Sequence, residues 1–213
     1  MNRRFIFNVE PFNAYSEFDE TIDAIGEYDE AFEFFDPELG EEWSGEMAES
    51  SFRPTSVESP GGGRIRNKTA PRPSDVATVS GYGGKRIPLH RLAAEAWRAL
   101  VSAARADGLR EPLLLPTSGF RDPQHQERLW RAALERYGSP QEARKWVAPP
   151  GGSAHQSGRA IDFYVGGKNS SRNVAHLRTL PAYRWLVANA MRFGFYPYSA
   201  EPWHWEYNPP AAA

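Results

Sequence analysis

The spacing of apolar residues predicts helices and short strands in the C-terminal part of the chain. Over residues 88–106, apolar side chains recur every three or four positions, which predicts an amphipathic helix that Gly108 ends. Asp122 followed by Pro123 predicts a second helix start, because aspartate caps free amides and proline fits the first turn; Gly138 ends that helix. Similar patterns predict helices at 139–142 and 181–193 and strands at 113–115, 160–165 and 203–207. Since helices and strands mix without regular alternation, the predicted class is α+β.

The first part of the chain lacks this periodicity. Acidic residues alternate with aromatic ones from residue 10 to residue 49, and such self-repelling composition predicts a disordered or docking segment over residues 1–50. Six glycines and four prolines in residues 51–84 predict a linker. The folded domain is therefore expected at 85–208, followed by a tail at 209–213.

Charge divides the chain at almost the same place. The whole chain carries a formal charge of −2, but residues 1–60 hold 16 acidic and 3 basic side chains, and residues 61–213 carry a net charge of +11. The arginines of the basic part are scattered along predicted helices without a dense run or a nucleic-acid-binding motif, so we expect no nucleic-acid partner. The basic part is expected to attract the acidic segment of its own chain and thereby mask its own surface.

The absence of cysteine narrows the possible chemistry. It excludes a disulfide scaffold, a cysteine nucleophile and a thiolate-bound metal, so any metal must be bound by histidine and carboxylate side chains. No stretch reaches the roughly 18 to 20 apolar residues that a membrane span needs. The short apolar run at residues 5–7 is soon interrupted by polar residues, so we expect neither a Sec-type signal peptide nor a membrane anchor.

Two of the five histidines lie in segments suited to metal binding. His155 follows a glycine-containing loop, and Asp162 comes seven residues later in a predicted strand. His204 lies among large aromatic residues that would exclude bulk water. Two imidazoles and one carboxylate form a known catalytic zinc set, which leaves one coordination position open for water. The other histidines, His90, His125 and His176, are assigned no role, because a single histidine is more often an ordinary polar residue.

A carboxylate near the metal but not bound to it is the usual acceptor of the water's proton. Glu201 is one candidate, because Pro202 stiffens the turn and lets Glu201 and His204 point into one cavity. Glu206 is the other, because strand alternation places it on the same face as His204. The residues alone leave both candidates open.

Three motifs resemble those of the VanY-type zinc D-alanyl-D-alanine carboxypeptidases, peptidoglycan peptidases that share a fold with the Hedgehog amino-terminal domain. They are residues 118–126 (SGFRDPQHQ), residues 153–162 (SAHQSGRAID) and residues 201–204 (EPWH). Each motif alone is weak evidence, but the three in the family's order are specific. The resemblance covers about residues 85–208 and implies a small, mainly antiparallel sheet flanked by helices.

The resemblance also implies a role for each motif residue. It implies three zinc ligands: His155, Asp162 and His204. Glu201 becomes the catalytic base, and Arg121 binds the substrate and the oxyanion, a role that suits a permanently charged, forked donor. Ser153 and Gln126 would be hydrogen-bonding neighbours of the substrate. Phe120 stands where the family more commonly has tyrosine, which removes one hydroxyl near the substrate.

The implied function is zinc-dependent hydrolysis of the peptidoglycan stem peptide by a D,D- or L,D-carboxypeptidase that acts as a monomer. A stem endopeptidase and a noncatalytic zinc-stabilised module for cell-wall binding or signalling are the alternatives. The basic surface would favour approach to an anionic cell wall. Because no Sec signal is visible, we expect action at the cell envelope after nonclassical export, with the acidic N-terminal segment addressing the enzyme, as an effector, to a secretion or injection apparatus.

Overall fold

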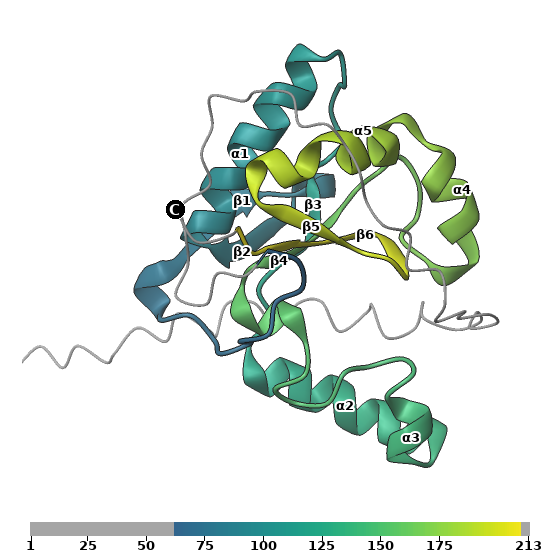
Figure 1. Ribbon diagram of the computed structural model, residues 1–213. Coiled ribbons are helices and arrows are strands. Elements are labelled where there is room, and N and C mark those ends of the chain that lie inside the picture. The colour runs from purple at the N-terminus through teal and green to yellow at the C-terminus, as the bar shows by residue number, and fades with distance from the viewer. Residues whose placement is uncertain (1–61, 210–213) are drawn as a thin grey trace, which may run out of the picture.

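A four-stranded sheet organises the part of the chain that the computed structural model describes, residues 62–209 (Figure 1). The strand order is β3-β4-β6-β5, and every neighbouring pair is antiparallel. The strands are β3 (Pro116–Ser118), β4 (Ala160–Phe163), β5 (Phe195–Tyr198) and β6 (Glu201–Tyr207). The predicted α+β class and the mainly antiparallel sheet are confirmed.

The helices cover both sides of this sheet. Figure 1 shows α1 (Arg91–Ala106) and α5 (Pro181–Asn189) on one side, and α2 (Pro123–Tyr137) with α3 (Pro140–Ala143) on the other. A short helix, α4 (Val174–Thr179), precedes α5, and a 3-10 helix, Ala190–Phe193, follows it. None of the helices within residues 62–209 combines the length and the apolar character of a membrane span.

Local capping signals explain why helix α2 was predicted well. The Asp122 carboxylate accepts the His125 backbone N–H at 2.7 Å, and Gly138 ends the helix in the left-handed conformation with a φ of 74°.

Helix α1 begins later than the apolar pattern predicts, because residues up to His90 pair with another strand. Strand β2 (Arg86–His90) forms an antiparallel hairpin with β1 (Val76–Ser80).

Residues 62–84 fall within the linker expected at 51–84, and the structure buries some of their side chains in the domain. Ile65 is 3% exposed and contacts Ala154 and Ala160, and Val79 of β1 belongs to the main core. Glycine misleads here because it serves a turn: Gly83 lies between β1 and β2 with a φ of 68°. The predictions for residues 1–50, 51–61 and 210–213, including the disordered docking segment, lie outside the described residues.

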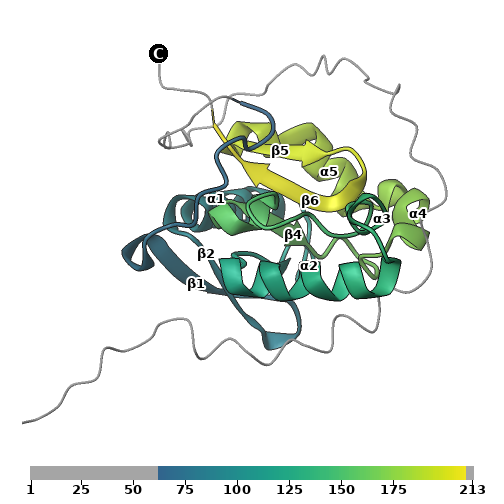
Figure 2. The same ribbon diagram turned by 90° about the horizontal axis from the view of Figure 1, so that it is seen from below.

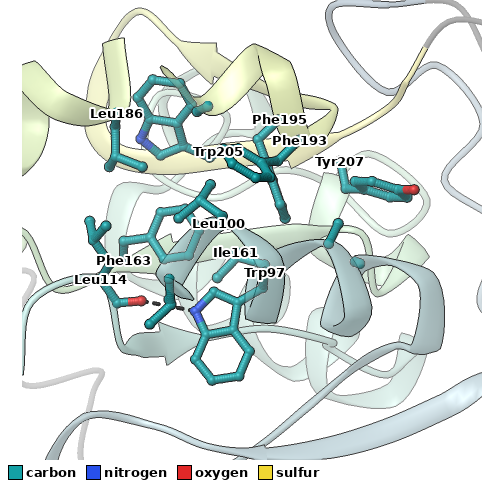
Figure 3. Packing of buried hydrophobic residues seen from close by; sticks show 14 of the residues in the cluster. Trp97, Leu100, Leu114, Ile161, Phe163, Leu186, Phe193, Phe195, Trp205 and Tyr207 are labelled. Atoms are coloured by element: carbon teal, nitrogen blue, oxygen red, sulfur yellow. Dashed lines mark hydrogen bonds between the residues drawn. The ribbon is translucent and has the colours of Figure 1, made fainter. Parts of the chain in front are cut away.

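The strand predicted at 113–115 is also misplaced. Leu114 has a φ of 64°, so the chain turns there, and the strand β3 begins only at Pro116. The turn is fixed by the core, because the Leu114 side chain is buried and its carbonyl accepts the Trp97 indole N–H at 3.0 Å (Figure 3). Burial of the leucine therefore reflects a packed turn.

The alternation of side chains along β4 and β6 gives the sheet two different faces. One face packs on the core shown in Figure 3, to which these strands contribute Ile161, Phe163, Trp205 and Tyr207. Neighbouring residues point to the opposite side of a strand. Asp162, His204 and Glu206 therefore lie on the second face, called the site face below.

Candidate metal centre

Three predicted ligands meet on the site face. His155 lies in the 3-10 helix η4 (Ala154–Ser157), Asp162 in β4 and His204 in β6, where it is the register partner of Asp162. Each residue offers a ligand atom, and these atoms lie within 4.8 Å of one another. The His155 Nε2 atom is 3.4 Å from Asp162 Oδ2, and the His204 Nδ1 atom is 2.9 Å from Asp162 Oδ1. The structure thus brings together residues that are up to 49 positions apart in the chain.

Hydrogen bonds on the far side of each imidazole decide which nitrogen faces the cluster. His155 Nδ1 lies 2.7 Å from the Gly119 carbonyl, which can only accept, so Nδ1 donates and Nε2 presents its lone pair toward Asp162. His204 Nε2 lies 3.4 Å from Glu206 Oε1, which leaves Nδ1 toward Asp162. Metal-bound histidines typically donate their other N–H to a carbonyl or a carboxylate in this way.

The electrostatics of the group suit a bound cation. Burial would raise the pKa of Asp162, but the neighbouring His155 and His204 outweigh it and hold that pKa below its ordinary value. Burial would lower the pKa of His204, yet hydrogen bonds with Asp162 and Glu206 raise it to about 9. Burial lowers the pKa of His155 in spite of Asp162. The negative charge of Asp162 favours a positive charge beside it, which a proton on His204 or a divalent cation can supply. Two imidazoles and one carboxylate are also a ligand set that zinc uses, so the group fits zinc.

The two candidate bases lie in different environments. Glu201 Oε2 is 3.9 Å from His204 Nδ1, the nitrogen that faces the cluster, and its side chain is 39% exposed. Burial raises the pKa of Glu201 although the charge of His204 opposes the shift. Glu206 is fully buried and lies beside His204 Nε2, on the far side of the ring. Glu201 therefore lies on the side of His204 that faces the cluster, whereas Glu206 lies on the far side of the ring.

Arg121 lies beside the same group. Its backbone N–H donates to the His155 carbonyl at 3.1 Å. Its charge adds to the effect of burial in lowering the pKa of His155, and it opposes the rise that burial causes in the pKa of Glu201. Its Nη1 donates to Gln126 Oε1 at 3.1 Å. Gln126 is fully buried, and its side-chain amide donates to the Ala148 carbonyl at 2.6 Å. This second hydrogen bond fixes the Gln126 side chain, which in turn holds the Arg121 guanidinium in place.

Ser153 lies just before η4 and is buried, with its carbonyl accepting the Gln156 N–H at 3.2 Å.

The sequence reasoning missed three contributors to the site: the Gly119 carbonyl, Arg64 and the Ile65 N–H. Strand alternation had pointed to Glu206, but the partners that occupy its carboxylate lie 141 and 142 positions away and leave no local signal.

The chain is similar to known proteins of one family. The model of the VanY family, described as D-alanyl-D-alanine carboxypeptidase, matches residues 86–210. The chain is 33% identical over 161 residues to a D-alanyl-D-alanine carboxypeptidase of Enterococcus faecalis, which covers 67% of this chain and 56% of that protein. It is 35% identical over 126 residues to the bifunctional D-Ala-D-Ala dipeptidase and D-Ala-D-Ala carboxypeptidase VanXYC of Enterococcus gallinarum, covering 54% of this chain and 64% of that protein. The chain thus spans less than two thirds of the length of these relatives.

A solved structure shares the fold. The LD-carboxypeptidase LdcB superposes with a TM-score of 0.56 at 23% identity, covering 73% of this chain and 89% of LdcB. At this identity the likeness supports the architecture alone, and it agrees with the antiparallel sheet and flanking helices described above.

Proposed function

Because the chain belongs to the VanY family, whose model covers more than half of it, we propose that it is a zinc-dependent D-alanyl-D-alanine carboxypeptidase. Its substrate would be the peptidoglycan stem peptide, from which it removes the terminal D-alanine. The observation that carries the proposal is the group of His155, Asp162 and His204, in which both imidazoles are buried, with the half-exposed Glu201 beside it.

The zinc ion would be held by the three ligand atoms that face one another, Nε2 of His155, a carboxylate oxygen of Asp162 and Nδ1 of His204. When bound, zinc supplies a Lewis acid that polarises the scissile carbonyl and acidifies a water molecule. The far-side hydrogen bonds of both histidines prepare them for this role, because they fix the ring orientations before a metal arrives.

Glu201 acts as the proton carrier in the proposed reaction. Its carboxylate takes a proton from the attacking water, whose oxygen bonds to the amide carbon. The C–N bond then breaks, and the same proton goes to the nitrogen of the leaving D-alanine. A carboxylate with a raised pKa serves both steps, since it takes up and releases the proton more evenly near neutral pH.

Arg121 acts on the substrate. Its guanidinium is permanently charged, and the hydrogen bond to the buried Gln126 fixes its direction while other donors remain for a ligand. It would bind the terminal carboxylate of the stem peptide or the negative oxygen that develops at the scissile carbonyl. Ser153, in the loop before His155, is proposed as a hydrogen-bonding neighbour of the same peptide.

A digest of defined peptides tests this function. Purified full-length protein is incubated with a stem pentapeptide ending in D-Ala-D-Ala, and the products are identified by mass spectrometry. We expect loss of a single alanine, no reaction after treatment with a chelator, and recovery when zinc is added. A tetrapeptide and a cross-linked dimer are digested in parallel. Cleavage of the tetrapeptide alone would indicate an L,D-carboxypeptidase, and cleavage inside the dimer would indicate an endopeptidase.

The substitution Glu201→Gln tests the proton carrier. The amide keeps the size of the side chain but cannot accept the proton, so kcat should fall by about 10²- to 10⁴-fold. The zinc content should remain one ion per chain. Glu95→Gln on the exposed face of α1 is the matched control and should leave kcat unchanged. Turnover near the wild-type rate in Glu201→Gln would remove Glu201 from this role.

A further inference from the structure

Residues 62–68, called the strap below, pack against the site face although they precede the family's matched range of 86–210. Figure 2 shows this first described segment, in dark blue, beside the yellow strand β6. Ile65 buries its side chain against Ala154 of η4 and Ala160 of β4. Asn208, directly after β6, donates its side-chain amide to the carbonyls of Gly63 and Arg64 at 3.3 Å and 3.4 Å. The strap is therefore anchored to the same elements that carry the proposed metal ligands.

The strap supplies most of the hydrogen bonds of the Glu206 carboxylate. Among the described residues, three donors reach this fully buried group. Arg64 Nε lies 2.6 Å from Oε1, the Ile65 backbone N–H bonds Oε2, and His204 Nε2 lies 3.4 Å from Oε1. A buried carboxylate is costly unless such donors satisfy it. The direction of the Glu206 carboxylate, and with it the partner of His204, therefore depends on the strap.

Arg64 reaches His204 by a second route. Its guanidinium carbon lies 4.0 Å from the centre of the Tyr198 ring, a distance typical of a cation–π contact. The Tyr198 ring in turn meets the His204 ring edge-on, with centroids 5.7 Å apart and an interplanar angle of 77°. Arg64 thus contacts both Glu206 and Tyr198, which hold the His204 ring at two different places.

We propose that the strap is a positioning element of the metal site, with Arg64 as the positioning residue that acts on His204 through Glu206 and Tyr198. The inference rests on the metal site of the proposed function, but it does not depend on the substrate. When a hydrogen-bonding partner already orients an imidazole, metal binding does not carry the entropic cost of fixing the ring. Loss of such partners typically weakens metal affinity by about 10- to 100-fold.

The experiment measures zinc affinity in the full-length protein by competition with a chromophoric chelator. For Arg64→Ala we expect a zinc Kd that is about 10- to 100-fold weaker than in the wild type. Cobalt(II) bound in place of zinc provides a second readout, since its visible spectrum depends on ligand geometry. The spectrum of Arg64→Ala should differ from that of the wild type.

Arg66→Ala is the matched control. Arg66 also belongs to the strap, its side chain is exposed, and it makes no hydrogen bond or ion pair with any other residue in 62–209. The variant removes the same charge two positions away, so its zinc Kd should stay within about twofold of the wild-type value. Arg64→Lys is the milder second variant, which keeps the charge but lacks the Nε donor; its affinity should fall between wild type and Arg64→Ala.

Several results would overturn the inference. Unchanged affinity and spectrum in Arg64→Ala and Arg64→Lys would do so, even if the melting temperature of the metal-free protein fell, because that pattern indicates a purely structural role. Equal weakening in Arg64→Ala and Arg66→Ala would also do so, because it indicates loss of general charge. Failure of the wild-type protein itself to bind zinc would refute the proposed function together with this inference, and is recognised without any variant.

Discussion

At the scale of single residues, Arg121 combines a permanent charge with a fixed direction. Its guanidinium is bonded to the buried Gln126, and its backbone N–H bonds the carbonyl of the proposed ligand His155. Lysine would keep the charge, but it has no planar fork with which to hold a carboxylate at two points. The substitution Arg121→Lys therefore separates the effect of the positive charge on substrate binding from the effect of the forked guanidinium geometry.

Arg121→Lys should raise KM for a stem pentapeptide and lower kcat/KM by about 10-fold or more, in the range of one lost charge-assisted hydrogen bond. Zinc affinity should change little, because Arg121 does not contact the metal-facing atoms. Steady-state kinetics of the variant and the wild type provide the measurement. Arg131→Lys, on the exposed side of α2 and paired with Glu127, serves as the control. Unchanged kcat/KM in Arg121→Lys would exclude Arg121 from substrate binding.

The candidate ligands could be predicted from the sequence because their residue types are scarce. Five histidines and no cysteine leave few possible metal ligands, and His155, Asp162 and His204 stand in recognisable motifs. The choice between Glu201 and Glu206 could not be made from the residues alone. The two carboxylates differ because Arg64 and the Ile65 N–H bond the Glu206 carboxylate from more than 140 positions away, and local periodicity does not reveal such distant partners.

At the scale of secondary-structure elements, the turn between η4 and β4 ties the metal ligands to the rest of the fold. Gly158 ends η4 with a φ of 67°, and its carbonyl accepts the His90 N–H at 2.8 Å. A Cβ atom at Gly158 would lie 2.9 Å from the His90 nitrogen. The close approach joins His155 to the junction of β2 and α1, and it leaves no room for a side chain.

Gly158→Ala should therefore destabilise the protein more than an alanine at an open turn does. Gly83→Ala is a close control, because Gly83 has a φ of 68° and a Cβ there would meet no atom within 4 Å. Both variants carry the cost of left-handed alanine, about 1–2 kcal/mol, and Gly158→Ala adds the clash with the His90 backbone. Thermal unfolding of the metal-free proteins compares them. Equal losses of melting temperature would show that the clash relaxes without cost.

Helices whose ends are marked by capping residues in their own sequence are predicted more accurately than strands that depend on partners far away in the chain. Asp122 and Gly138 mark the ends of α2 by their own hydrogen bonds and backbone conformation. The strand β1 has no such mark, and it pairs with β2 across a turn whose glycines had suggested a linker. The apolar run around Leu114 predicts a strand where the chain turns, because burial in the core and extension in a sheet favour the same apolar residues.

At the scale of the whole molecule, metal binding and folding should be coupled. The proposed ligands come from η4, β4 and β6, so they converge only in the folded chain. A ligand that binds only the folded state stabilises it, by about 2.7 kcal/mol at a concentration 100 times its Kd. For a protein of this size, that free energy should raise the melting temperature by about 5–10 °C.

Thermal unfolding with and without zinc checks this coupling. The wild-type protein should melt at a higher temperature when zinc is present, and chelator should reverse the increase. Asp162→Asn removes the anionic ligand, so most of the zinc-dependent increase should disappear in that variant. If Asp162→Asn gained the same increase as the wild type, zinc would be stabilising the protein from another place.

The strap also affects how the protein can be shortened for expression. The match to the family model begins at residue 86, and a start codon placed there would look reasonable from that match alone. Such a truncation would remove β1, the pairing partner of β2, together with both strap donors to Glu206. A shortened version that preserves the metal site must therefore begin at or before residue 62.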